Sequence, residues 1–89
     1  MLKPVTSSKF KKDVKQANRR NKDMEKLREL INLLVNEKVL AESYKDHPLH
    51  NNWSGYRDAH IEPDWLLIYK VSGESLYLTR TGTHADIFE

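Results

Sequence analysis

The hydrophobic pattern of the chain changes its period near the middle, and this change limits the fold more than any other feature. Up to about residue 38, apolar residues recur every three or four positions, which is the spacing of one face of an α-helix. From residue 56 onward they alternate or run continuously, as is typical of β-strands. Helices followed by strands predict an α+β fold, in which two N-terminal helices pack on an antiparallel sheet.

The first half is expected to hold one short edge strand and two helices. The strand covers residues 2–6, and the helix that follows it ends near Asn21. The second helix begins near Asp23 and ends between Asn36 and Lys38. The apolar faces that predict these helices are formed by Phe10, Val14 and Ala17 in the first, and by Met24, Leu27, Ile31 and Leu34 in the second.

The second half is expected to form a three-stranded meander. Strands are predicted at residues 56–61, at residues 65–71 and after a turn at residues 72–74. The resulting element order is βααβββ, and the 89 residues make one domain, 1–89. In the last strand, alternation predicts a shared face for Leu76, Leu78 and Arg80.

These strands and turns gather the residue types that acid–base cleavage needs. Asp58 and His60 are two positions apart in a strand, so their side chains point to the same side. Asp64 follows the next turn and His84 follows the last strand, so both can reach the same region. Two imidazoles can act as base and acid, and Arg80 can stabilise charge on a phosphate. The set fits cleavage of RNA through its 2′-hydroxyl group without a metal ion.

The first 28 residues are strongly basic. They hold ten Lys and Arg against three acids, whereas the rest of the chain holds five against ten. Such asymmetry predicts a surface for phosphate backbones or for an acidic partner, and the plain alternative is a solvated helix face. The residues expected to bind RNA are Lys9, Lys11, Lys12, Lys15, Arg19, Arg20 and Lys22.

Other classes of function find less support in the sequence. There is no cysteine, so disulfides and thiolate ligands are excluded. A metal site made of His47, His60, Asp64 and His84 matches no compact ligand motif, and neither a metal nor another cofactor is predicted. Any single histidine taken alone is more often structural than catalytic. The longest apolar run is too short to cross a bilayer, and a soluble, cytoplasmic protein without membrane contact is expected.

Three segments give the sequence a specific resemblance. They are residues 44–49, residues 55–65 and the run from Arg80 to His84, with Trp53 and Phe88 nearby. Together they closely resemble the YafQ family, toxins of the RelE superfamily from bacterial type II toxin–antitoxin systems. The likeness extends over essentially the whole chain. One departure is Asn51, where the family usually has glycine; asparagine tolerates left-handed backbone angles, so the turn is expected to persist.

The resemblance implies a RelE-like, microbial-ribonuclease-like fold and an mRNA endonuclease (mRNA interferase) that cuts in the ribosomal A site. It implies His84 as general acid, Asp64 or His60 as base or as the group that orients the 2′-hydroxyl, Arg80 on the phosphate, and Phe88 as support. The choice of base among His47, His60 and Asp64 stays open. The implied active-site positions are His47, Asp58, His60, Asp64, Arg80, His84 and Phe88.

The implied partners are a cognate antitoxin protein, the 70S ribosome and mRNA, with operator DNA reached indirectly through the antitoxin. The basic helices would rest on ribosomal RNA. The alternative is a non-catalytic module on the same scaffold that binds RNA or the antitoxin.

Overall fold

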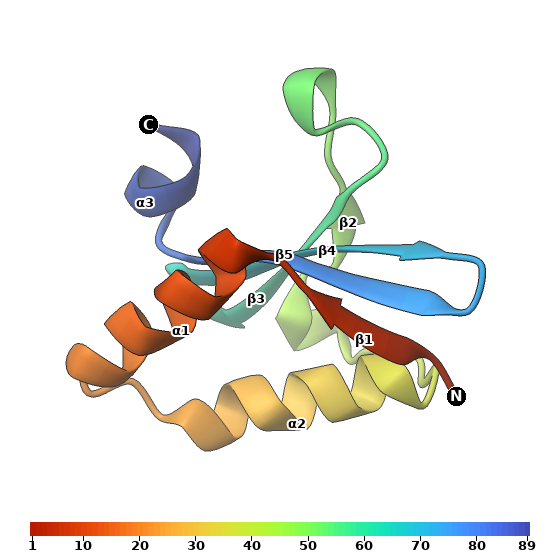
Figure 1. Cartoon of the computed structure of the whole chain (residues 1–89), viewed down its shortest axis with the longest axis horizontal. Helices are drawn as coiled ribbons and strands as arrows, with labels where there is room; N and C mark the ends of the chain where they lie inside the picture. The colour runs from red at the N-terminus through yellow and green to blue at the C-terminus, as the bar shows by residue number, and fades with distance from the viewer.

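The structure is a computed structural model that describes residues 1–89. It confirms the α+β class (Figure 1). The elements in chain order are β1 (Lys3–Thr6), α1 (Ser8–Arg19), α2 (Met24–Val35), the 3-10 turn η1 (Glu42–Tyr44), β2 (His47–Pro48), the 3-10 turn η2 (Asn51–Trp53), β3 (Arg57–Glu62), β4 (Trp65–Ser72), β5 (Ser75–Gly82) and α3 (His84–Phe88).

The expected order βααβββ is incomplete, because β2 and α3 were not predicted. A two-residue strand and a five-residue helix are too short to show a period. The sheet order is β1-β5-β4-β3-β2. Strand β1 pairs in parallel with β5, so the sheet is mixed rather than wholly antiparallel. A parallel pair needs a long crossover, and the intervening helices and strands supply it.

The helices begin and end close to the predicted positions. Ser7 caps α1, and its hydroxyl accepts a hydrogen bond from the amide of Phe10 at 2.9 Å. Asp23 caps α2 in the same way through the amide of Glu25. Asn21 separates the two helices with a left-handed φ of 60°. None of the helices has the length and apolar character that crossing a membrane requires.

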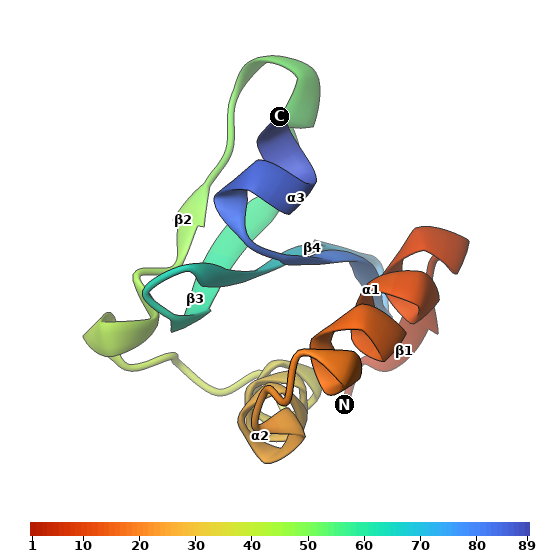
Figure 2. The same cartoon turned by 90° about the vertical axis from the view of Figure 1, so that its left-hand side faces the viewer.

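The two faces of the sheet carry separate apolar clusters. Helix α2 lies on one side of the sheet and α3 on the other (Figure 2). The larger cluster joins α1 and α2 to the sheet, and the smaller one joins α3 to it. The smaller cluster is made of Leu66, Ile68 and Ile87, with Leu49, Trp53 and Tyr56 against it. The larger one includes Phe10, Ala17, Leu27, Leu30, Leu34, Trp65, Leu67, Tyr69, Leu76 and Leu78.

Beyond the end of β1, the start of α1 makes hydrogen bonds along the same edge of β5. The last pair between the two strands is Thr6 with Leu78. Beyond it, the hydroxyl of Ser7 donates to the carbonyl of Thr79 at 2.7 Å. The amide of Thr81 donates to the carboxylate of Asp13 at 3.1 Å. The N-cap Ser7 and Asp13 of α1 thus satisfy backbone groups of β5 that have no strand partner beyond the end of β1.

A β-bulge in β5 changes the direction of Arg80. Leu78 pairs with Tyr69, and Arg80 pairs with Ile68, so Thr79 is the extra residue. Leu78 therefore belongs to the larger cluster. Arg80 lies on the opposite face of the sheet, which is the face of Ile68, a member of the smaller cluster. The expectation that Arg80 shares a face with Leu76 and Leu78 was wrong, because alternation assumes an unbroken ladder.

Candidate active site

Strands β2 and β3 bring His47, Asp58 and His60 together, and we call these three residues the imidazole cluster. His47 pairs directly with Asp58 in the sheet register. The Nε2 atom of His47 lies 3.8 Å from Oδ2 of Asp58, and Nε2 of His60 lies 3.7 Å from Oδ1. The predicted shared face of Asp58 and His60 is confirmed. The turn that leads from β2 to β3 contains Asn51 with φ 58°, the left-handed backbone expected there.

Asp58 is the buried centre of this cluster. It is 3 % exposed, and its Oδ1 atom has no hydrogen-bond partner. Burial raises the pKa of its carboxyl group, and the charges of His60 and His47 oppose that rise. A carboxyl group in this setting favours a shared proton or a nearby cation.

The ring of His47 is oriented by the backbone. Its Nδ1 atom lies 2.6 Å from the carbonyl oxygen of Lys45. A carbonyl can only accept, so Nδ1 carries the proton and Nε2 of the neutral ring presents its lone pair to Asp58. Asp46 anchors this segment, since its carboxylate accepts hydrogen bonds from Arg57 at 3.1 Å and from the hydroxyl of Tyr69 at 2.6 Å.

The imidazole cluster also fits a metal ion. One ligand atom from each of its three residues lies within 4.8 Å of the other two. Two imidazoles and a carboxylate suit a transition ion, and the orphaned Oδ1 of Asp58 would gain a partner. This set differs from the four ligands considered from the sequence, because Asp64 and His84 bind each other instead.

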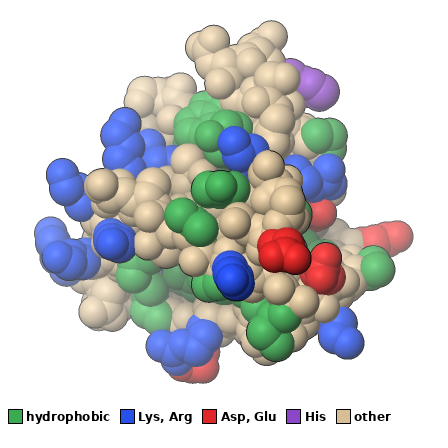
Figure 3. All heavy atoms as spheres, turned by 45° about the vertical axis from the view of Figure 1, so that its right-hand side comes forward, with side chains coloured by type: hydrophobic (Ala, Val, Ile, Leu, Met, Phe, Trp, Pro, Cys, Tyr) green, Lys and Arg blue, Asp and Glu red, His purple; other side chains and the backbone are tan.

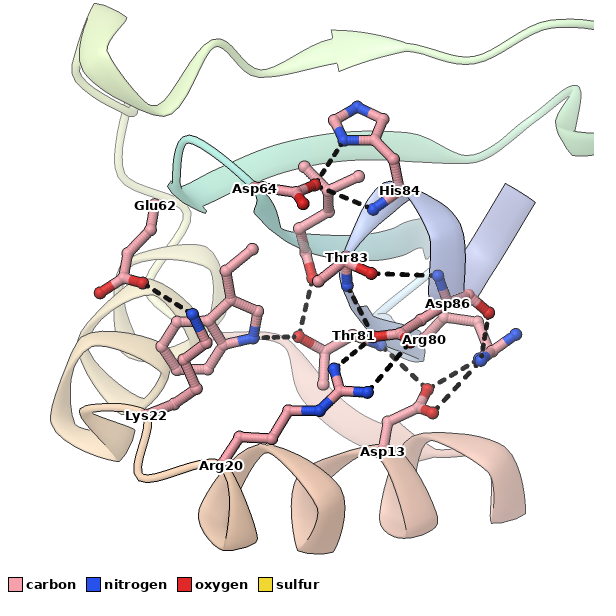
Figure 4. Close-up of polar contacts among 12 residues, drawn as sticks. Asp13, Arg20, Lys22, Glu62, Asp64, Arg80, Thr81, Thr83, His84 and Asp86 are labelled. Atoms are coloured by element: carbon pink, nitrogen blue, oxygen red, sulfur yellow. Dashed lines mark hydrogen bonds and ion pairs between the residues drawn. The ribbon is translucent and has the colours of Figure 1, made fainter. Parts of the chain in front are cut away.

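His84 and Asp64 form a second pair beside the cluster. The Nδ1 atom of His84 lies 2.8 Å from Oδ1 of Asp64, and the His84 amide donates to the same oxygen at 3.0 Å (Figure 4). Both bonds lower the pKa of the Asp64 carboxyl group. Because Asp64 accepts at Nδ1, the Nε2 atom of His84 is the one left to act. Thr83 caps α3 and fixes the position of His84 at its first turn.

Six of the seven predicted active-site residues lie in one continuous area. The ring of His60 lies 6.2 Å from that of His47 and 5.9 Å from that of His84, between centroids. The ring of Phe88 follows at 6.1 Å from His84. Asp58 and Asp64 complete the area through the contacts described above.

Arg80, the seventh residue, takes no part in the contacts that join the other six and forms a bidentate pair with Asp13. Its Nε and Nη2 atoms donate to the Asp13 carboxylate at 2.7 and 3.2 Å, and Nη2 also donates to the carbonyl of Asp86 at 3.3 Å. The hydrogen bond to Asp13 raises the pKa of Arg80, which stays charged. Its side chain is 17 % exposed. Sequence reasoning missed Asp13, although its spacing from Phe10 and Ala17 puts it on the buried face of α1.

The seven basic residues expected to bind RNA fall into two groups. Arg20 is paired with Asp86 at 2.7 Å, and Lys22 with Glu62 at 3.2 Å. The pairing with Arg20 lowers the pKa of Asp86 to about 2. In Figure 3, many Lys and Arg side chains lie on the left of the view, and the Asp and Glu side chains lie mostly on the right. The other five of the seven are exposed and form no ion pair; they are Lys9, Lys11, Lys12, Lys15 and Arg19.

Fold and site together define a small α+β protein with an imidazole–carboxylate area suited to acid–base chemistry. Comparison with known proteins narrows this class. Residues 2–89 match the family model described as the bacterial toxin of the type II toxin–antitoxin system, YafQ. The chain therefore belongs to the YafQ family of bacterial toxins.

Individual relatives support this assignment. The chain is 57 % identical over 83 residues to the mRNA interferase toxin YafQ of Escherichia coli strain B / BL21-DE3, with 92 % of this chain and 90 % of the relative covered. It resembles the crystal structure of the E. coli DinJ–YafQ complex with a TM-score of 0.93 and 52 % identity over all of both chains. It also resembles a metal-bound toxin from Helicobacter pylori, with a TM-score of 0.93, 38 % identity and 99 % and 100 % of the two chains covered.

Proposed function

We propose that this protein is an endoribonuclease toxin, an mRNA interferase that cuts mRNA in the ribosomal A site and stops translation. The observation that carries the proposal is the pair His60 and His84, whose ring centroids are 5.9 Å apart and which each adjoin a carboxylate. Two rings this close can both reach the same phosphodiester, one imidazole as base and the other as acid. Relatives named mRNA interferase toxins, at 55–57 % identity, support the substrate class.

His84 serves as the general acid in this scheme. Asp64 accepts at Nδ1 and orients the ring, so in the protonated imidazolium it is Nε2 that presents a proton to the leaving 5′-oxygen. The ring is 54 % exposed, so a substrate can approach it. No other side-chain hydrogen bond competes for Nε2 of His84.

His60 serves as the general base that takes the proton of the 2′-hydroxyl. Asp64, the other candidate, is a weak base because its hydrogen bonds to His84 lower its pKa. His60 lies between His47 and His84 in the row of rings, so it faces the acid across the shortest gap. His47 is the alternative base, since its Nε2 atom also presents a lone pair.

Arg80 and Phe88 assist from the edges of this area. The Nη1 atom of Arg80 makes no hydrogen bond within the chain, so it can contact a phosphate while Asp13 holds the other two nitrogens. Phe88 is 40 % exposed and lies against His84, where it can support that ring or the mRNA.

The exposed basic face of α1 supports binding to ribosomal RNA and to an acidic antitoxin. Its five unpaired cations can neutralise phosphates, which gives strong and salt-dependent binding. The complex of an E. coli relative with DinJ supports an antitoxin partner for this chain as well. Operator DNA would be reached through that antitoxin.

A metal ion is not needed in this scheme. A transition ion held by His47, Asp58 and His60 would supply a Lewis acid when bound. The same ligation would occupy the lone pairs of both imidazoles that can act as base. The proton transfers proposed for His60 and His84 therefore describe the metal-free protein.

The test is cleavage of one mRNA on programmed ribosomes and free in solution, with the ends of the products mapped. A cut on the ribosome that leaves a 2′,3′-cyclic or 3′-phosphate is expected from wild-type protein and from His50→Gln, an exposed histidine outside the site. His84→Gln should not cut. If wild-type protein binds ribosomes and cuts nothing, the non-catalytic module is the better description.

A further inference from the structure

A groove of about 660 Å³ lies beside the active-site area. It runs between the N-terminal end of α1, the turn η2, the end of β5 and α3. Its nine lining residues include Lys9, Trp53, Tyr56 and Arg80. We call it the flank groove.

A continuous row of aromatic rings joins the active-site area to the flank groove. Beyond His84 and Phe88, the ring of Trp53 lies 6.0 Å from Phe88, and Tyr56 lies 5.4 Å from Trp53, both edge to face. Trp53 and Tyr56 rest with one side on the small apolar cluster and are half-buried. Rows of this kind are what single-stranded nucleic acid uses as a stacking platform.

The charges of the flank groove favour an anionic chain. None of its nine lining residues carries a carboxylate, and two are cations. Lys9 is exposed and unpaired, and Arg80 keeps Nη1 available because Asp13 engages Nε and Nη2. The ammonium group of Lys70 lies 5.0 Å from the ring centroid of Tyr56, which adds positive charge at the far end.

We propose that the flank groove binds the nucleotide of single-stranded RNA that adjoins the scissile one. Its base stacks at Tyr56 and Trp53, and its phosphate lies between Lys9 and the free Nη1 of Arg80. This inference rests on the proposed function, since it assigns the substrate strand a path away from the same site. Because every base has a stacking face, the groove adds affinity without choosing the codon.

Two matched pairs of variants test this path. Lys9→Gln and Tyr56→Leu alter the groove, and Lys38→Gln and Tyr77→Leu make the same changes at exposed positions outside it. Tyr77 is a close control because its ring also faces Lys70, at 5.3 Å. Thermal unfolding first establishes that each variant is folded. Leucine keeps an apolar contact at position 56 and removes the aromatic face together with the hydroxyl group, as it also does at position 77.

The first readout is single-turnover cleavage on programmed ribosomes as a function of toxin concentration. Each groove variant should raise the half-saturating concentration roughly tenfold, the size typical of one lost stacking or phosphate contact, with the maximal rate kept. The control variants should stay within about twofold of wild type. Equal behaviour of Tyr56→Leu and Tyr77→Leu would overturn the proposal.

The second readout does not depend on cleavage. The His84→Gln variant is bound to programmed ribosomes whose mRNA carries 4-thiouridine on either side of the expected cut, and photo-crosslinks are mapped. A crosslink within residues 53–56 from one of these positions is expected, and its loss in Lys9→Gln supports the groove. Crosslinks confined to other segments would overturn it even if wild-type protein cuts. A crosslink within residues 53–56, together with no cleavage by the wild-type protein, would instead overturn the proposed function and retain the groove.

Discussion

Asp13 and Arg80 form a bidentate ion pair that joins helix α1 to the end of strand β5, across 67 positions of the sequence. Asp13 also accepts the amide of Thr81, so one carboxylate holds both the side chain and the backbone at this point. The helix that presents the basic face therefore also orients the one arginine of the candidate site. The RNA binding proposed for α1 and the phosphate contact proposed for Arg80 therefore depend on the same ion pair.

Asp13→Asn should destabilise the fold by about 2–4 kcal/mol, because it leaves the guanidinium of Arg80 largely buried without its counter-charge. The loss should stay below the largest values found when fully buried ion pairs are broken, because both side chains keep some exposure. Urea unfolding at neutral pH measures the change. Cleavage should fall as well, through a misplaced Arg80.

The double variant Asp13→Asn with Arg80→Met is the control, because it removes both charges and keeps an oxygen that can accept the amide of Thr81. It should be more stable than Asp13→Asn alone. A loss below about 0.5 kcal/mol in Asp13→Asn would mean that the pair is solvated and does not fix Arg80.

The same pair shows how far sequence reasoning reaches. Period and capping residues predicted both helices and the central strands, because those signals are local. The direction of Arg80 depends on a bulge at Thr79, which is set by pairing with β4 and by Ser7 and Asp13 on the β5 edge. Such constraints are tertiary and leave no local pattern.

Within the site, sequence predicted the residue types and part of their grouping. Asp58 and His60 follow from strand alternation alone. The approach of His47 depends on β2, a strand of two residues that Asp46 anchors through Arg57 and Tyr69. No periodicity marks so short a pair, and the resemblance rather than the spacing placed His47 in the site.

Asp86→Asn should destabilise the fold near pH 7 and have little effect near pH 2. The pKa of Asp86 is lowered to about 2, chiefly by the hydrogen bond from Arg20, so its stabilising contribution is present above the unfolded value of 3.8 and disappears as pH falls through 2. Since Arg20 is partly exposed, the loss should be about 1–2 kcal/mol. Urea unfolding at both pH values measures it, and a loss independent of pH would assign the effect to the α3 cap.

Gly82→Ala should also destabilise the end of β5. A Cβ atom at Gly82 would lie 2.9 Å from Oδ2 of Asp86 and 3.0 Å from its Cβ, so the capping side chain of α3 would have to move. The expected cost is about 1–3 kcal/mol in urea unfolding. Gly73→Ala is the contrast in packing, because nothing lies within 4 Å of its Cβ position. An equal loss at both glycines would point to backbone strain alone.

Asp58→Asn should raise the unfolding temperature at pH 8. Burial raises the pKa of Asp58, so its contribution to stability is greatest below pH 3.8 and is lost as pH rises through the folded value. The amide removes this cost and can donate to the lone pair of His47. The gain should shrink toward pH 4, as followed by circular dichroism. A lower unfolding temperature at pH 8 would show that the charged carboxylate is well compensated.

The last prediction concerns the acid and the base. If His60 and His84 act in these roles, cleavage by wild-type protein should follow a bell between about pH 5 and 9, because an imidazole loses its proton near neutrality. The rising limb reports the deprotonation of His60, and the falling limb reports the loss of the proton from His84. His60→Gln should remove the rising limb, and His84→Gln the falling one, in residual rates measured at single turnover. His47→Gln should keep both limbs, because its ring only borders the base. If His47→Gln instead removes the rising limb and His60→Gln keeps it, the base is His47. Asp58 would then interact chiefly with the ring of His47.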